Sequence, residues 1–181
     1  MQFDATSLPG VYLLTPKVFG DERGFFMESW NAEAFRDADF DLHFVQDNHS
    51  RSARGILRGL HYQTRHTQGK LVRVTMGSVF DVAVDLRRDS PTLGQWYGVT
   101  LDAQAHKMLW IPPGFAHGFY VTSESADFQY KCTERYDPES EVTIAWDDPD
   151  LAIEWPLVDG AAPSLSAKDQ AGLAFADAPL L

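Results

Sequence analysis

Several features that stabilise or anchor other chains are missing from this sequence. Its 181 residues include one cysteine, which excludes an intrachain disulfide and any structural zinc site built on cysteines. No apolar run approaches the roughly 18 residues that a membrane-spanning helix needs. The N-terminus has no basic start followed by an apolar stretch, so we expect no signal peptide and a cytoplasmic protein.

The sequence patterns of several common enzyme sites are absent as well. No G-x-x-x-x-G-K-[ST] phosphate loop, G-x-G-x-x-G turn or G-x-S-x-G nucleophile elbow occurs. Metal-binding β-barrels usually offer two histidines as H-x-H on one strand, but His61 is followed by Tyr62 and Gln63. We therefore expect no metal and no cofactor, unless metal ligands come from distant strands. General acid–base catalysis is the chemistry that is left.

The composition is that of a globular domain with an acidic surface. A chain of this length fits one domain of roughly 100–200 residues, and its apolar fraction of 44% supplies a core. We expect residues 1–181 to form one domain with a short helical tail from about residue 166. The net charge of −11 argues against nucleic acid and anionic membranes as partners.

Residues 51–73 differ from the rest of the chain because they contain no Asp or Glu. The cations of this window are Arg51, Arg54, Arg58, Arg65, Lys70 and Arg73. A local positive field inside an acidic protein suggests an anionic small ligand, such as a sugar nucleotide. The alternative interpretation is a solvated strand edge whose charges prevent further pairing.

The dominant local pattern is that of β-strands. Apolar and polar residues alternate over residues 79–86, which follow the apolar run 71–76 after Gly77 and Ser78, so the two runs predict a hairpin. Further short runs occur at 96–101, 107–111, 118–122, 127–133 and 142–146. They predict a mainly β fold, a jelly-roll barrel with a few short helices and a ligand inside the barrel or at its mouth. Asn31 and Ser166 are the predicted N-caps of two short helices, the second with Asp169 in a capping box.

His61 is the histidine best suited to act as a base. It lies inside the acid-free window, where neighbouring cations lower the pKa of an imidazole and keep it neutral. A histidine that only forms a hydrogen bond within the sheet is the alternative.

A set of motifs gives the chain a resemblance to one family. They are Asp21–Glu28 (DERGFFME), Gln46–Ser50 (QDNHS), Gly59–Gln63 (GLHYQ), Gln68–Val72 (QGKLV), Pro112–Phe119 (PPGFAHGF), Tyr130–Thr133 (YKCT) with Tyr136 and Glu141, and Leu165–Asp169 (LSAKD). In this order they resemble the dTDP-4-dehydrorhamnose 3,5-epimerase family. The resemblance implies a cupin-type jelly roll, a homodimer, and an isomerase without metal or cofactor. Its reaction would convert dTDP-4-dehydro-6-deoxy-D-glucose to dTDP-4-dehydro-L-rhamnose in rhamnose biosynthesis.

The resemblance also assigns catalytic roles. His61 would remove the proton, Asp169 would orient the imidazole, Tyr130 would return a proton from the other face, and Lys70 would stabilise the enolate oxygen. Each has a purely structural alternative: a capping carboxylate for Asp169, a buried hydrogen-bonded tyrosine for Tyr130 and a strand-edge charge for Lys70.

The substrate-binding residues implied by the resemblance are Arg23, Glu28, Gln46, Asp47, Asn48, Arg58, Lys70, His117, Tyr136, Glu141 and Lys168. Tyr136 would stack on thymine, and Arg23 and Glu28 would come from the partner subunit, because the N-terminal strands of this family are exchanged. Ordinary surface polarity is the alternative for all of them. Three other functions stay open: a single-centre epimerase acting at C3 or C5 alone, a cupin module that binds without turnover, and a metal-dependent oxygenase.

Overall fold

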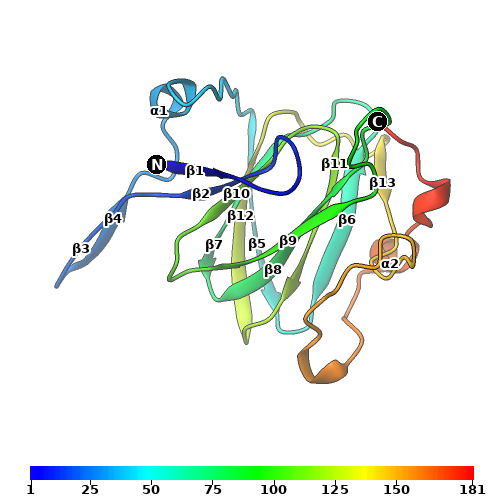
Figure 1. The fold of residues 1–181 in the computed structure, drawn as a ribbon. Coiled ribbons are helices and arrows are strands. Elements are labelled where there is room, and N and C mark those ends of the chain that lie inside the picture. The colour runs from blue at the N-terminus through cyan, green and yellow to red at the C-terminus, as the bar shows by residue number, and fades with distance from the viewer.

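The computed structural model describes residues 1–181 and consists mainly of two antiparallel β-sheets that pack against each other (Figure 1). The six-stranded sheet runs in the spatial order β1 (Gln2–Ala5), β2 (Tyr12–Thr15), β10 (Met108–Ile111), β7 (Lys70–Met76), β12 (Ser125–Cys132) and β5 (Gln46–Ala53). The five-stranded sheet runs β13 (Glu141–Thr143), β6 (Leu57–Gln63), β11 (Phe115–Val121), β8 (Ser78–Asp85) and β9 (Trp96–Asp102). The predicted mainly β jelly roll is confirmed.

The predicted hairpin between residues 71–76 and 79–86 is wrong. Both strands exist, but β7 pairs with β10 and β12, whereas β8 pairs with β9 and β11 in the other sheet. Gly77, with φ of +73°, is the single residue between them, and a Cβ atom there would collide with the Ser125 carbonyl. The chain therefore crosses from one sheet to the other at Gly77. An alternating pattern reports that a strand has two faces and does not report which strand lies beside it.

The core has two layers because the five-stranded sheet is covered on both faces. Side chains of both sheets, including Val72, Ala83 and Phe128, form the inner layer. On the opposite face of the five-stranded sheet, Leu60 and Tyr120 pack against the C-terminal part of the chain, residues 144–181. Burial on both faces means that Asp81 and Asp85, the two aspartates of β8, are as inaccessible as its valines.

The helices are short and begin at the predicted caps. In α1 (Ala32–Arg36), the side chain of Asn31 accepts hydrogen bonds from the backbone of Glu33 and Ala34. In α2 (Ala167–Gln170), the Ser166 hydroxyl accepts one from the backbone of Asp169. Two 3-10 turns, η1 (Val158–Gly160) and η2 (Phe175–Asp177), complete the C-terminal part. None of the helices has the length and apolar character needed to cross a bilayer.

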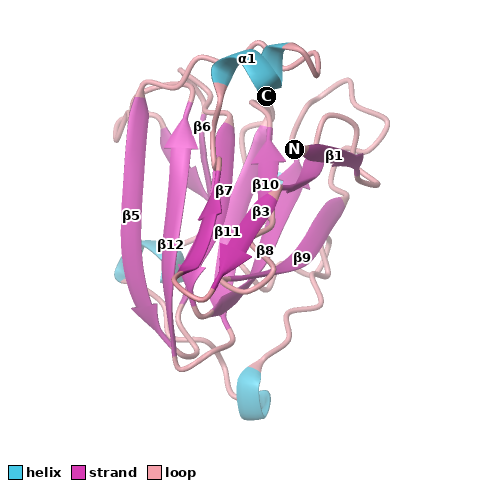
Figure 2. Cartoon of the chain, turned by 90° about the vertical axis from the view of Figure 1, so that its left-hand side faces the viewer, coloured by secondary structure: helices cyan, strands magenta, loops and turns pink.

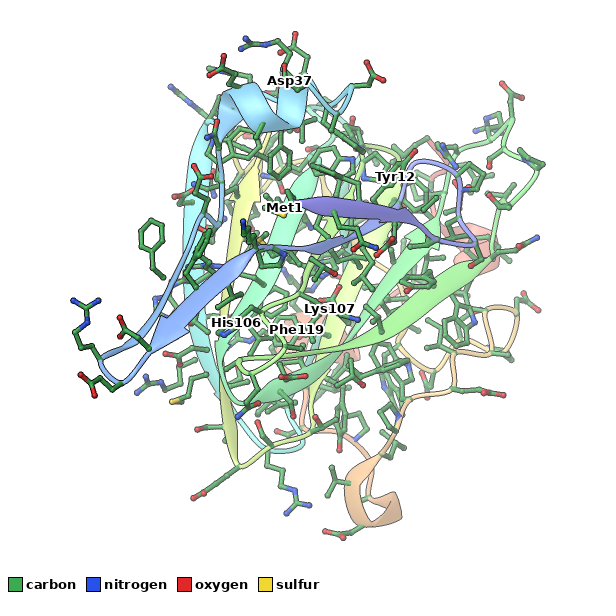
Figure 3. All side chains as sticks on the ribbon, turned by 60° about the vertical axis from the view of Figure 1, so that its left-hand side comes forward. Met1, Tyr12, Asp37, His106, Lys107 and Phe119 are labelled. Carbon is green, nitrogen blue, oxygen red and sulfur yellow. The ribbon has the colours of Figure 1, made fainter.

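A two-stranded hairpin, β3 (Val18–Asp21) and β4 (Gly24–Met27), projects from the body of the molecule (Figures 1 and 3). In the view of Figure 2 it passes in front of the six-stranded sheet. It exposes three phenylalanine side chains, Phe19, Phe25 and Phe26, at 53%, 61% and 66%. Phe19 and Phe26 are cross-strand partners, whereas the Phe25 ring lies against that of His106, with centroids 4.4 Å apart. Exposed aromatic surface of this kind is typical of an interaction site.

Candidate active site

A cavity of about 330 Å³ is lined by residues of both sheets and by three residues outside the strands, Gln68, Tyr136 and Lys168. Its lining residues are Gln46, Asn48, Ser50, Arg58, His61, Gln68, Lys70, His117, Phe119, Tyr130, Tyr136, Glu141 and Lys168. Most of the candidate site residues that the sequence suggested are therefore brought together in one place. The exceptions are Arg23, Glu28, Asp47 and Asp169, which are described below.

His61 lies on β6 and is held by a carboxylate from the C-terminal part of the chain. Its Nε2 is 2.5 Å from Oδ1 of Asp169, a residue that is 4% exposed. The other carboxylate oxygen accepts a hydrogen bond from Ser166 Oγ at 2.7 Å, while the Asp169 amide donates to the same hydroxyl. Asp169 therefore both contacts His61 and takes part in the helix cap, two roles that the sequence could not separate. The imidazole Nδ1 makes no hydrogen bond within the protein.

The electrostatics of this pair favour a neutral imidazole beside an ionised carboxylate. Burial by itself would raise the pKa of Asp169, but hydrogen bonds from His61 and Ser166 bring this pKa down to about 2. Burial is also the main cause that lowers the pKa of His61; the hydrogen bond to Asp169 opposes it, and the charges of Lys168 and Lys70 lower the pKa further. The expected direction is found, with burial as a larger cause than the neighbouring cations.

Tyr130 lies on β12 of the opposite sheet and lines the same cavity. Its ring centroid is 5.9 Å from that of Phe128, which belongs to the inner core, so the phenol is on the inward face of the strand. Burial raises the pKa of Tyr130 to about 12. The phenol is therefore protonated at neutral pH. It lies on the opposite side of the cavity from His61, where it can donate a proton to a bound molecule.

Two of the cations in the acid-free window face the cavity, and others do not. Lys70 is buried at the start of β7, and burial lowers its pKa. Neither Lys70 nor Arg58 takes part in an ion pair, although Arg58 donates a hydrogen bond to Ser52. Arg51 and Arg65 instead pair with carboxylates outside the cavity. Lys70 and Arg58 thus fit the interpretation as a site for an anionic ligand, whereas Arg51 and Arg65 fit the interpretation as charges on a solvated strand edge.

The mouth of the cavity carries a small hydrogen-bonded network. Glu141 accepts hydrogen bonds of 2.7 Å from the Tyr136 hydroxyl and from Lys168 Nζ, so its charge is balanced. Gln46 accepts a hydrogen bond from the Tyr136 backbone. Tyr136 itself is 51% exposed, which leaves part of its ring free for a planar ligand.

Three predicted binding residues lie outside the cavity of their own chain. Arg23 is in the projecting hairpin and pairs with Asp21, and Glu28 accepts a hydrogen bond from Asn31. Asp47 binds Lys131 at 3.0 Å on the other face of β5. Alternation along this strand explains its position, because the neighbouring residues 46, 48 and 50 are the ones that line the cavity.

Sequence reasoning missed a second histidine–aspartate pair beside the first. His117 is opposite His61 in the register of β11 and β6, and its Nε2 is 3.0 Å from Asp81 Oδ2. Asp81 is completely buried, and its other oxygen has no hydrogen-bond partner. The sequence feature that could have revealed this pair is the aspartate at position 81 of the alternating run 79–86, and it becomes informative only once both faces of that strand are known to be buried.

Close approach of two strands sets these histidines side by side. Gly59, with φ of +130°, faces Gly118, and a Cβ atom on Gly59 would be 2.5 Å from the Cα of Gly118. A side chain there would separate β6 from β11. No group of three or more His, Cys, Asp or Glu side chains is arranged to hold a metal ion.

The fold and the cavity together define a jelly-roll protein whose cavity is lined by a half-buried histidine, paired with a buried aspartate, and by a half-buried tyrosine of the opposite sheet. A family model described as dTDP-4-dehydrorhamnose 3,5-epimerase matches residues 5–177. The chain belongs to the dTDP-4-dehydrorhamnose 3,5-epimerase family.

Individual relatives agree with this assignment. The chain is 60% identical over 179 residues to a dTDP-4-dehydrorhamnose 3,5-epimerase of Pseudomonas aeruginosa, with 98% of both proteins covered. A dTDP-6-deoxy-D-glucose-3,5-epimerase from Legionella pneumophila, solved in complex with dTDP-4-keto-L-rhamnose, is 53% identical with a TM-score of 0.92 over 96% of this chain and 92% of that one. A 3'-monoepimerase from Streptomyces bikiniensis, solved with dTDP-quinovose, is 34% identical with a TM-score of 0.88 over 94% of this chain and 86% of that one.

Proposed function

We propose that the protein is a 3,5-epimerase that converts dTDP-4-dehydro-6-deoxy-D-glucose to dTDP-4-dehydro-L-rhamnose, a step in the biosynthesis of dTDP-L-rhamnose. The observation that supports this most directly is the His61–Asp169 pair on one wall of a cavity that has Tyr130 on the other wall. Family membership supplies the substrate, because the names of the Pseudomonas and Legionella relatives specify a dTDP-linked 4-keto sugar.

The chemistry needs one base, one acid and a stabiliser for an enolate. C3 and C5 both flank the C4 ketone, so the same carbonyl acidifies both C–H bonds. The neutral His61 takes the proton through Nδ1, and Lys70 stabilises the negative charge that develops on the carbonyl oxygen. Tyr130 then gives its proton to the carbon from the opposite face. Asp169 orients the imidazole and balances the charge of the imidazolium that forms.

After each inversion, His61 and Tyr130 must return to their starting protonation states. Each inversion leaves one proton on His61 and removes one from Tyr130, so exchange with solvent must restore both before the next inversion. No metal or cofactor enters these steps.

The nucleotide part of the substrate fits the polar half of the cavity. Arg58 and Lys168 offer cations to the diphosphate, and Gln46 and Asn48 offer amide groups. Tyr136 stacks on thymine, a contact that contributes about 1–3 kcal/mol by analogy with other base–aromatic stacks.

A homodimer in the cytoplasm completes the proposal. The projecting hairpin carries Arg23 away from its own cavity and exposes Phe25 and Phe26, which suits insertion into a second copy. Arg23 and Glu28 of one copy then contribute to the site of the other. Sedimentation at low concentration should give a dimer, and a Phe25→Ser/Phe26→Ser variant should shift it towards monomer; a wild-type monomer with full activity contradicts this arrangement.

Solvent exchange tests the reaction itself. In D₂O, deuterium should enter the product at both C3 and C5, and His61→Ala should abolish incorporation at both. No exchange at either carbon rejects the epimerase and, if dTDP still binds, favours a binding module.

Label at one carbon only would instead make the protein a single-centre epimerase. The similarity to the Streptomyces 3'-monoepimerase keeps this second candidate in view. Stoichiometric iron found by elemental analysis, together with activity that requires it, would favour an oxygenase.

A further inference from the structure

The side chains that line the cavity are mostly polar. Tyr136, Glu141 and Lys168 form the mouth, and His61, Lys70 and Tyr130 lie in the reacting part. Among the lining residues, Phe119 alone has an entirely hydrocarbon side chain. Figure 3 shows it in the middle of the molecule.

Phe119 is fixed by its neighbours on both sheets. It is 5% exposed, and its ring stacks on Phe128 with centroids 4.1 Å apart and planes inclined by 16°. On β11 it lies two residues from His117, on the same face, and it is opposite Arg58 of β6. β11 therefore carries Phe119 on the same wall of the cavity as His61, and the pairing of β11 with β6 shifts register between these two positions.

The substrate proposed above has one apolar substituent on its hexose, the C6 methyl group, which is bonded to the reacting carbon C5. The hydroxyl, carbonyl and diphosphate groups of the same molecule all require polar partners. A methyl group next to the base needs an apolar contact within the reach of a hexose ring, and Phe119 supplies that surface in the cavity.

We propose that Phe119 is a specificity-determining residue that forms the subsite for the C6 methyl group and makes the enzyme select 6-deoxy sugars over 6-hydroxylated ones. This inference rests on the proposed function. A buried phenyl ring stacked on a second one offers no hydrogen bond to a C6 hydroxyl, which would lose its water without compensation. Apolar pockets discriminate against an added hydroxyl by up to about a hundredfold, so we expect a preference of about ten- to a hundredfold.

The test compares two substrates that differ only at C6: the 6-deoxy-4-keto sugar nucleotide and its counterpart with a hydroxymethyl group. The wild type should have a kcat/KM about ten- to a hundredfold higher for the 6-deoxy compound. Phe119→Tyr adds a hydroxyl to the ring and should reduce this preference at least several-fold, whereas Phe119→Leu keeps an apolar surface and should retain most of it.

Binding of dTDP is the matched control, because dTDP lacks the sugar. Wild type and both variants should bind dTDP equally. Equal turnover of the two sugars by the wild type overturns the inference without any variant, even though the epimerase itself would stand. Variants that weaken dTDP binding as strongly as they weaken turnover would show that Phe119 only maintains the shape of the cavity, which would overturn the inference. Absence of turnover with the 6-deoxy substrate would be a failure of the proposed function instead.

Discussion

Replacement of Asp169 by asparagine isolates the role of the carboxylate that holds His61. The substitution keeps the side-chain volume and removes the charge. In the native site Oδ2 accepts a hydrogen bond from Ser166 and Oδ1 faces His61 Nε2. An asparagine that keeps its oxygen towards Ser166 turns its NH₂ group towards His61. The imidazole must then accept at Nε2 and carry its proton on Nδ1, the atom that has to take the proton from the substrate.

The size of the effect follows from this change of tautomer. Asparagine in place of the orienting aspartate lowers kcat by about 10⁴ in serine hydrolases, through the same tautomer exchange. We expect a fall in kcat of about 10³ to 10⁴ for Asp169→Asn. Because Asp169 does not line the cavity, the KM should change by no more than about threefold, as befits an interaction made only in the transition state.

The assay is deuterium incorporation at C3 and C5 in D₂O, which reports proton removal directly. Asp4→Asn, a change to an exposed carboxylate on β1, is the control and should leave the rate unaltered. Thermal unfolding of both variants shows whether the fold is intact. A folded Asp169→Asn protein with kcat within tenfold of the wild type would refute the orienting role.

Four further predictions concern Tyr130, Lys70, the pH dependence of the reaction and the core. Tyr130→Phe should lower the rate of net epimerisation by about 10² to 10⁴, while His61 still removes a proton. NMR in D₂O should therefore show deuterium entering the substrate faster than product forms. Lys70→Met should lower kcat by about 10² to 10³, because one donor to the enolate oxygen is lost; an unchanged kcat would contradict this. Since burial lowers the pKa of His61 and the base must be neutral, the acid limb of kcat/KM should have its midpoint below pH 6.5, and a midpoint above that value would contradict the assignment. Leu60→Ala should lower the free energy of unfolding by about 2–5 kcal/mol in urea denaturation, since Leu60 is fully buried against the C-terminal part of the chain.

Local patterns in the sequence predicted many of the strands and both helices, but they did not predict which strands pair with each other. Alternation and turn residues predicted the strands from residue 70 onwards, and Asn31 and Ser166 marked both helix starts. The pairing of β7 with β8 failed because a single residue, Gly77, carries the chain from one sheet to the other. The first six strands, β1 to β6, were not predicted.

In the candidate site, too, the sequence identified some residues correctly and misplaced or missed others. The motifs around His61, Lys70 and Tyr130 pointed to residues that lie around one cavity. Asp47 was proposed from its motif as well, but its side chain is on the other face of β5. Asp81 escaped notice because an aspartate in an alternating strand looks like a solvent-facing residue.

By itself, the sequence determined the class of fold, the start of each helix and the residue types available for acid–base chemistry, because these depend on neighbours a few positions away. Only the tertiary structure showed that Asp169 both caps its helix and contacts His61 across 108 positions, and that Asp81 pairs with His117. Contacts of this kind depend on which strands share a sheet and which face of each strand is covered. Burial and charge then act between groups that the chain order keeps far apart.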